Sequence, residues 1–192
     1  ICNFPPFAFL EQYENNCAHT IAELEELLPL LREKGTEICT AEKGEIFELD
    51  GVTFEILRTY DTAITANADN NSSMVFRMEA CGQSVLFTGD LGIEGGNQVL
   101  ETVAPEKIKV DFVQMAHHGQ NGTARSFYEA CEPKACLWAT PIWLWNNDAG
   151  KGYNTHFWQT VIVRGWMEEL GVKHHFANKD GTQVITLPYP LD

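Results

Sequence analysis

The hydrophobic positions near the start of the chain follow a helical period. Residues 18–34 are predicted to form a helix, kinked at Pro29 and ended by Gly35. Apolar side chains recur every three or four residues there, at Ile21, Leu24, Leu27, Leu28 and Leu31. Residues 1–17, which are rich in aromatic side chains, show no such period and are predicted to be irregular.

Strand-like segments follow, grouped in pairs. Asp50-Gly51 is a strong hairpin turn signal between two of them. The run Val85-Leu86-Phe87 is continuously apolar, which is typical of a strand that is covered on both faces. The predicted strands of this half are residues 37–40, 45–49, 52–57, 74–78 and 84–88, with a polar loop at 61–71.

Beyond residue 90, strands alternate with helices. We predict helices at 97–103, 124–131 and 156–170, strands at 109–115 and 135–139, a loop at 143–153, and a closing hairpin of strands 172–177 and 183–187. Paired strands followed by alternating helices and strands indicate helices packed on sheet layers. The sequence therefore predicts an α+β or α/β fold, with 1–192 as one domain or part of one.

The charge and length of the chain argue against some classes of function. The 192 residues carry a net charge of −14, and a chain so acidic repels phosphate backbones, which argues against long nucleic acid as a partner. No apolar run approaches the roughly 20 residues of a membrane span. The first residue is Ile1 rather than Met, so we expect a fragment of a longer protein. The sequence does not determine the cellular compartment, and the cytoplasm is the favoured location.

The cysteines indicate neither a disulfide framework nor a zinc ribbon. No two of them form a CxxC pair, and several have apolar neighbours, so buried free thiols are the preferred interpretation. A thiol catalytic dyad built on Cys131 or Cys136 is disfavoured for the same reason. The six positions are Cys2, Cys17, Cys39, Cys81, Cys131 and Cys136.

A carboxylate follows the most apolar predicted strand, in Leu86-Phe87-Thr88-Gly89-Asp90. A side chain at a strand end is held rigidly and points into whatever lies beyond the sheet edge. Asp90 is therefore a candidate metal ligand. The competing interpretation is that Asp90 caps the next helix, because Asp is a favoured N-cap residue.

Histidines follow a second strand, in Met115-Ala116-His117-His118-Gly119. Neutral imidazole binds zinc and similar metals. Adjacent side chains on an extended chain point to opposite sides, so we expect one histidine to bind a metal and the other to face the substrate or support the site. The alternative is an ordinary histidine pair on a loop.

Taken together, the two motifs favour a hydrolytic metal centre on neighbouring strand ends. His156, at the start of the last long helix, is a further candidate that would line the cleft, or else a histidine near the helix dipole. His174 and His175 are expected to be structural, and His19 to lie on the surface. Nucleophile-elbow, dinucleotide and phosphate-loop motifs are absent from the sequence.

Residues 35–188 resemble the C-terminal part of metallo-β-lactamase-superfamily hydrolases. The β-lactamase-like domain of the ComEC-type competence proteins is the most similar type. The resemblance rests on Asn70–Phe76, Ser84–Asp90 and Val110–Gly119, and it extends to Asn154-Thr155-His156 and the Lys179-Asp180-Gly181 turn. Residues 1–34 form a lead-in segment and helix outside it.

The resemblance implies the C-terminal half of an αββα four-layer sandwich with one or two metal ions at the sheet edge. Zinc is expected, with iron or manganese as alternatives; Asp90 would bridge two ions, and either His117 or His118 would be a ligand. His118 and His156 would be the catalytic candidates. The H-x-H-x-D-H ligand motif of the family does not occur in this chain.

Two alternative functions are therefore considered. The first is part of a metal-dependent hydrolase, in which metal-bound hydroxide attacks a phosphoester, ester or amide of a small-molecule or phosphoester substrate. Its missing N-terminal half would be its main partner, and the fragment alone would be inactive. The second is a non-catalytic β-lactamase-fold binding or scaffold module that lacks the main ligand motif.

Overall fold

A single mixed sheet organises the structure, a computed structural model that describes residues 4–192. The seven strands lie side by side in chain order. Strands β1 to β4 are antiparallel to their neighbours, and β4 to β7 run parallel. The strands are β1 (Ile46–Leu49), β2 (Val52–Arg58), β3 (Val75–Ala80), β4 (Gln83–Phe87), β5 (Phe112–Gln114), β6 (Ala135–Trp138) and β7 (His174–Ala177).

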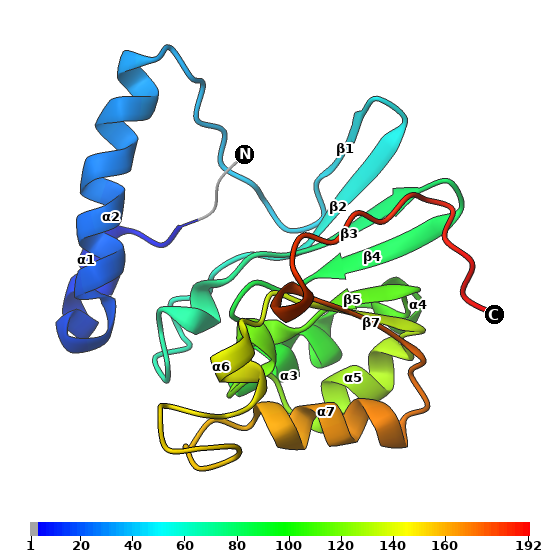
Figure 1. The fold of residues 1–192 in the computed structure, drawn as a ribbon. Coiled ribbons are helices and arrows are strands. Elements are labelled where there is room, and N and C mark those ends of the chain that lie inside the picture. The colour runs from blue at the N-terminus through cyan, green and yellow to red at the C-terminus, as the bar shows by residue number, and fades with distance from the viewer. Residues whose placement is uncertain (1–3) are drawn as a thin grey trace.

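Helices cover one face of this sheet (Figure 1). They are α3 (Ile93–Thr102), α4 (Pro105–Ile108), α5 (Arg125–Cys131), α6 (Ile142–Trp145) and α7 (Thr160–Glu169). Their apolar sides join the inward side chains of the strands in the largest core, which includes the fully buried Leu86, Val113 and Met167. The parallel strands thus lie next to the helices that connect them, as short crossovers require.

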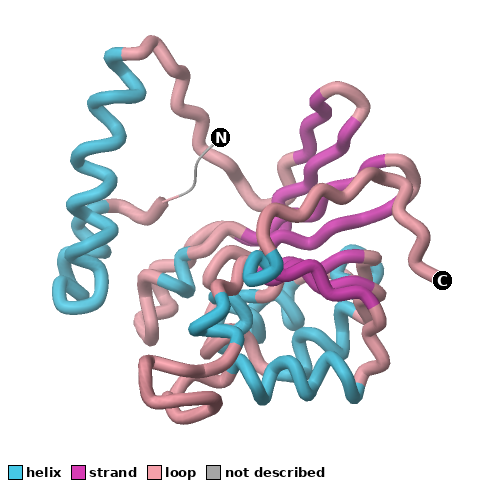
Figure 2. Tube along the Cα trace, viewed as in Figure 1, coloured by secondary structure: helices cyan, strands magenta, loops and turns pink. Residues whose placement is uncertain are grey.

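The N-terminal helices stand apart from the sheet (Figures 1 and 2). They are α1 (Phe7–Leu10), the 3-10 turn η1 (Glu11–Tyr13) and α2 (Glu14–Glu33), so helix begins earlier than predicted. Phe9, Leu10 and Cys17 bury a small separate core against Ala68. Pro29 lies inside α2, as predicted.

The second face of the sheet carries a row of aromatic side chains, and none of the α-helices formed by residues 4–192 packs on it. Phe47, Phe54, Phe76 and Phe87 contact one another in sequence across β1 to β4, with ring centroids 5.0, 6.3 and 4.7 Å apart. Over β4 to β7 the face is covered by the C-terminal segment, residues 182–192, through Ile185, Leu187, Tyr189 and Leu191. We call this second side the open face.

Two predicted strands do not form. Residues 37–40 offer only one partly buried apolar side chain, Ile38, and β1 already pairs with β2, so just an isolated bridge remains at Thr40. Residues 183–187 do not pair in a hairpin with β7, which instead runs parallel to β6. The physical reason is Tyr189, whose ring packs against Phe112 and Phe176 and holds the segment flat on the open face.

Other predicted boundaries shift as well. Helix α3 starts at Ile93 rather than 97, and α7 starts at Thr160 rather than 156 because residues 156–158 form an irregular aromatic cluster. The predicted loop 143–153 begins inside the short helix α6. Within the described part of the chain, no helix combines the length and hydropathy needed to cross a membrane.

Candidate metal centre

Asp90 follows a tight turn at the end of β4. Gly89 adopts φ +55°, and a Cβ atom there would lie 2.9 Å from the Ser73 hydroxyl oxygen. That hydroxyl accepts a hydrogen bond from the backbone N–H of Asp90 at 2.9 Å. The close approach explains why glycine precedes the carboxylate, because any side chain would displace Ser73.

Asp90 does not cap the helix that follows, so that competing interpretation is wrong. The N-cap of α3 is Gly92. The side-chain oxygen of the buried Asn71 accepts from the backbone N–H groups of Gly92, at 3.1 Å, and Gly95, at 2.9 Å. Because Asn71 satisfies the helix start, the Asp90 carboxylate, 39% exposed, is free for other contacts.

The histidine pair lies on a left-handed turn after β5 rather than on an extended chain. His117 and His118 have φ of +50° and +58°, and Gly119 follows at +76°. Gly119 lies against the Trp138 ring so closely that a Cβ atom would overlap it. The expectation that the two imidazoles alternate as on a strand is therefore wrong, since strand geometry ends before them.

His118 is oriented toward Asp90. Its Nδ1 lies 3.0 Å from the carbonyl oxygen of Ala139, and the Thr140 hydroxyl donates to the His118 carbonyl at 2.6 Å. Its Nε2 lies 3.6 Å from Oδ1 of Asp90. An imidazole whose Nδ1–H donates to a carbonyl keeps the Nε2 lone pair available, which is how metal-binding histidines are usually held.

The spacing of these two atoms suits a shared metal ion. It is longer than a good hydrogen bond. Two ligands of a tetrahedral zinc ion, each about 2.0–2.1 Å from the metal, lie roughly 3.3 Å apart. The observed 3.6 Å between Nε2 and Oδ1 is close to that value.

His117 has a different environment. Its backbone N–H donates to the Gly89 carbonyl at 3.0 Å, which joins the two strand ends directly. Its ring lies 6.1 Å from that of His118. Its Nδ1 is buried and has no hydrogen-bond partner among the described residues.

His156 belongs to an aromatic cluster rather than to the Asp90–His118 pair. Its ring lies tilted against Trp158, with centroids 3.8 Å apart, and the Trp158 ring centroid lies 5.0 Å from that of Trp143. Its Nδ1 is buried without a hydrogen-bond partner in the described region. The buried Asn147 holds the loop, because its amide donates to the His156 carbonyl at 2.8 Å.

The remaining histidines have structural or surface environments. His175 accepts from the Trp138 indole N–H at 3.1 Å, and its other ring nitrogen lies 3.1 Å from the Val172 carbonyl. Burial lowers the pKa of His175 below its usual value. The His174 ring packs edge-on against Tyr189. The His19 side chain is 83% exposed on α2.

The donors are too few for a complete metal shell. Across residues 4–192, no three His, Cys, Asp or Glu side chains gather so as to hold an ion. The cysteines do not contribute: Cys17, Cys131 and Cys136 are buried, and Cys39 and Cys81 are exposed, all as free thiols. Burial raises the pKa of Cys131 and Cys136, which makes them poor nucleophiles. Cys2 lies outside the described residues.

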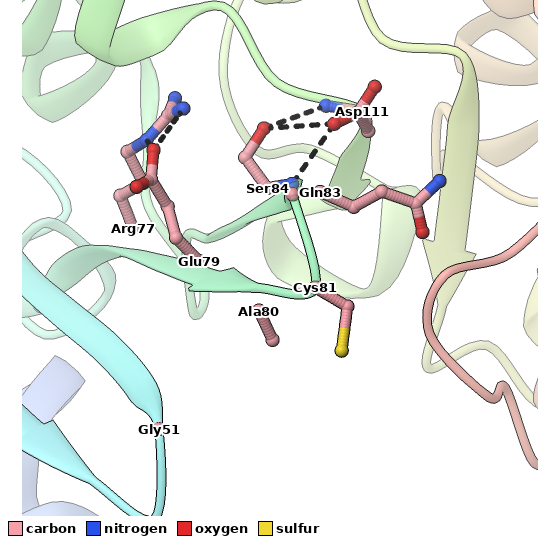
Figure 3. Close-up of a pocket in the computed structure, with 9 residues that line it drawn as sticks. Gly51, Arg77, Glu79, Ala80, Cys81, Gln83, Ser84 and Asp111 are labelled. Atoms are coloured by element: carbon pink, nitrogen blue, oxygen red, sulfur yellow. Dashed lines mark hydrogen bonds and ion pairs between the residues drawn. The ribbon is translucent and has the colours of Figure 1, made fainter.

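A hollow of about 290 Å³ lies at the opposite end of β4, beside the β3–β4 turn (Figure 3). Its charged side chains are already paired: Arg77 with Glu79, and Asp111 with Lys134 and the Ser84 backbone N–H. Burial alone would raise the pKa of Asp111, but the hydrogen bonds from Lys134 and Ser84 lower it. We therefore assign this hollow a structural role.

Sequence comparison finds a relative of part of the chain. No family model matches it. ComE operon protein 3 of Bacillus subtilis (strain 168) is 34% identical over 114 residues, which cover 59% of this chain and 14% of that protein. The chain thus spans only a small part of the length of this relative.

Solved structures with a similar arrangement were also found. The metallo-β-lactamase fold protein YhfI from Bacillus subtilis has a TM-score of 0.49 and 12% identity, covering 84% of this chain and 61% of its own. CmlA, a diiron β-hydroxylase from Streptomyces venezuelae, has a TM-score of 0.47 and 15% identity, covering 78% and 35%. The chain is thus similar to a metallo-β-lactamase-fold protein and to a diiron hydroxylase. The mixed sheet with its covering helices confirms the predicted α+β or α/β class.

Three supporting residues were not singled out from the sequence. Asn71 and Ser73 lie in the Asn/Ser run that carried part of the resemblance, and that run was the available signal. Gln114 lies in the segment before the histidines, where nothing in its residue type marked it out. All three bond to the backbone of residues 88–95.

Proposed function

We propose that this chain supplies Asp90 and His118 to the metal site of a metal-dependent hydrolase. The observation that carries the proposal is the approach of His118 Nε2 to Asp90 Oδ1 at 3.6 Å, with His118 Nδ1 directed at a backbone carbonyl. The sequence left open which histidine binds, and this geometry favours His118. Zinc is the proposed ion, with iron or manganese as alternatives.

The rest of the coordination shell would come from outside residues 4–192. A tetrahedral site needs about four ligands, and this chain offers two that converge. The open face is where a further layer would pack, because half-buried aromatic side chains line it over β1 to β4 and no α-helix of the described residues covers them. We therefore propose that residues 1–192 are the C-terminal half of a domain whose other half completes the site.

Each residue has a defined part in this proposal. A bound metal would supply hydroxide near neutral pH and polarise the scissile bond. Asp90 and His118 would hold the ion at the sheet edge, and the aromatic cluster around His156 would shape the substrate pocket. The substrate class is a small phosphoester, ester or amide, with the phosphodiester favoured by analogy alone.

A scaffold without catalysis is the second candidate. It is favoured by the lack of three converging ligands in the part of the chain that the structure describes. In that case Asp90 and His118 would form only an exposed polar pair on the surface. Such pairs contribute about 0–1 kcal/mol to stability, so losing one partner would change little.

Metal analysis of the intact protein separates the two candidates. We expect near-stoichiometric metal in the wild type and at least a tenfold loss of affinity in Asp90→Asn and His118→Gln. His19→Gln, on the exposed face of α2, is the matched control and should bind as the wild type does. A folded, metal-free wild type would favour the scaffold, and a loss in His117→Gln but not in His118→Gln would reverse the histidine assignment.

A further inference from the structure

Gln114 is the last residue of β5, the strand that leads to the histidine pair, and it faces the end of β4, which leads to Asp90. It is partly buried, and its side chain points toward the Thr88-Gly89 turn rather than along its own strand. The segment of Asp90 and the segment of the histidines are therefore linked by a side chain that is not itself one of the proposed ligands.

The side-chain amide of Gln114 bonds to the turn as both acceptor and donor. Its oxygen accepts from the backbone N–H groups of Thr88 and Gly89, each at 3.0 Å. Its nitrogen donates to the Gly89 carbonyl at 3.2 Å. In the other direction, the Thr88 hydroxyl donates a hydrogen bond of 2.8 Å to the backbone carbonyl of Gln114. The side chain of Gln114 thus holds the turn before Asp90 through three of its backbone groups, the Thr88 N–H, the Gly89 N–H and the Gly89 carbonyl.

The same turn is connected to the histidines. The Gly89 carbonyl that accepts from Gln114 also accepts from the His117 backbone N–H. Gln114 is itself only four residues before His118 in the chain. A shift of this amide would therefore move the carboxylate and the imidazole relative to each other.

We propose that Gln114 is a positioning residue that sets the separation between Asp90 and His118 for metal binding; the proposal rests on the proposed function. The role requires an acceptor and a donor on one planar group. Methionine has nearly the same length but would leave two backbone N–H groups unpaired beside the site. Glutamate keeps the oxygen that accepts from Thr88 and Gly89, but its second oxygen replaces the nitrogen that donates to the Gly89 and Met115 carbonyls.

The matched control is Gln83, because it makes the same type of contact away from the site. At the start of β4, its amide accepts from the Tyr189 N–H and donates to the Tyr189 carbonyl, both at 2.7 Å. Gln83→Met therefore removes a glutamine-to-backbone contact of equal kind at the opposite end of the strand.

The test measures Zn²⁺ and Co²⁺ binding by the intact protein, with amide hydrogen exchange at Thr88 and Gly89, whose N–H groups donate to Gln114. We expect Gln114→Met to weaken binding at least tenfold, to alter the visible Co²⁺ spectrum and to speed exchange at both amides. Gln83→Met should change none of these, and Gln114→Glu should retain most of the amide protection.

The outcomes distinguish the two proposals. A wild type that binds no metal overturns the proposed function and the positioning role with it. A wild type that binds metal, together with a Gln114→Met variant of equal affinity and unchanged Co²⁺ spectrum, overturns only the role of Gln114. If Gln83→Met weakened metal binding as much as Gln114→Met, the effect would be a general loss of stability, and this result would also count against the positioning role of Gln114.

Discussion

Two adjacent histidines in the left-handed region are an expensive local conformation. Residues other than glycine lose roughly 1–2 kcal/mol each there, and such strain is usually retained at functional sites. His117 and His118 both adopt it, and Gly119 continues the turn. The residue types that suggested a metal site were readable from the sequence, whereas this backbone conformation, which directs His118 toward Asp90, was not.

His175 gives the structure a defined response to acid. Its pKa is below the ordinary 6.5 because burial disfavours the charged ring. Above about pH 6.5 the ring is neutral in both states, so the folded state keeps its full stability. As the pH falls below 6.5 the unfolded chain takes up a proton that the folded chain resists, and the free energy of unfolding decreases until the folded pKa is passed.

We therefore expect His175→Gln to reduce the loss of unfolding free energy between pH 7 and pH 5. Denaturant unfolding followed by tryptophan fluorescence measures it, since His175 contacts Trp138. His19→Gln, at an exposed position, should keep the pH dependence of the wild type. A wild-type slope retained in His175→Gln would contradict this assignment.

At the scale of elements, the sequence predicted best where periodicity was strong and local. The β1–β2 hairpin at Asp50-Gly51 and the buried strand β4 formed as expected. The segment 183–187 has strand-like alternation, but its position is decided by the packing of Tyr189 on distant strands. The start of α3 was missed for a similar reason, because its cap comes from Asn71, more than twenty residues earlier.

This distant cap leads to a prediction. Asn71→Ala removes an acceptor shared by two backbone N–H groups of α3 and should destabilise the protein by about 1–2 kcal/mol. Amide exchange should speed up at Gly92 and Gly95 in particular. Asn70→Ala is the control, because the Asn70 side chain makes only an exposed contact with Asn67. Equal effects of the two substitutions would show that the cap contributes nothing special.

At the scale of the whole molecule, the two faces of the sheet differ in how completely the chain itself covers them. The helical face is closed by its own chain, with core residues such as Leu86 fully buried. On the open face, the C-terminal segment covers β4 to β7, whereas nothing in the described structure covers the aromatic row over β1 to β4, which stays half-buried. The sequence predicted the layered class, and it could not show which strands lack a covering layer because that depends on tertiary pairing.

If the remainder of the protein packs on the open face, Phe54 lies near the centre of the interface. It stacks on Phe47 and contacts Phe76. Burying a phenylalanine side chain contributes about 1.5–3 kcal/mol, so Phe54→Gln in the intact protein should lower the unfolding midpoint and weaken metal binding together. Both effects follow because the same layer would bring the missing ligands.

Ile46 provides the matched control for this prediction. It neighbours Phe47 on β1, so it points to the other face, and it is 60% exposed. Ile46→Gln should leave the unfolding midpoint and the metal affinity unchanged, because no layer is expected on that side of the hairpin. If Phe54→Gln behaves like Ile46→Gln, the open face is free in the intact protein, and the ligands that complete the site must reach Asp90 and His118 without a second sheet packed on the aromatic row.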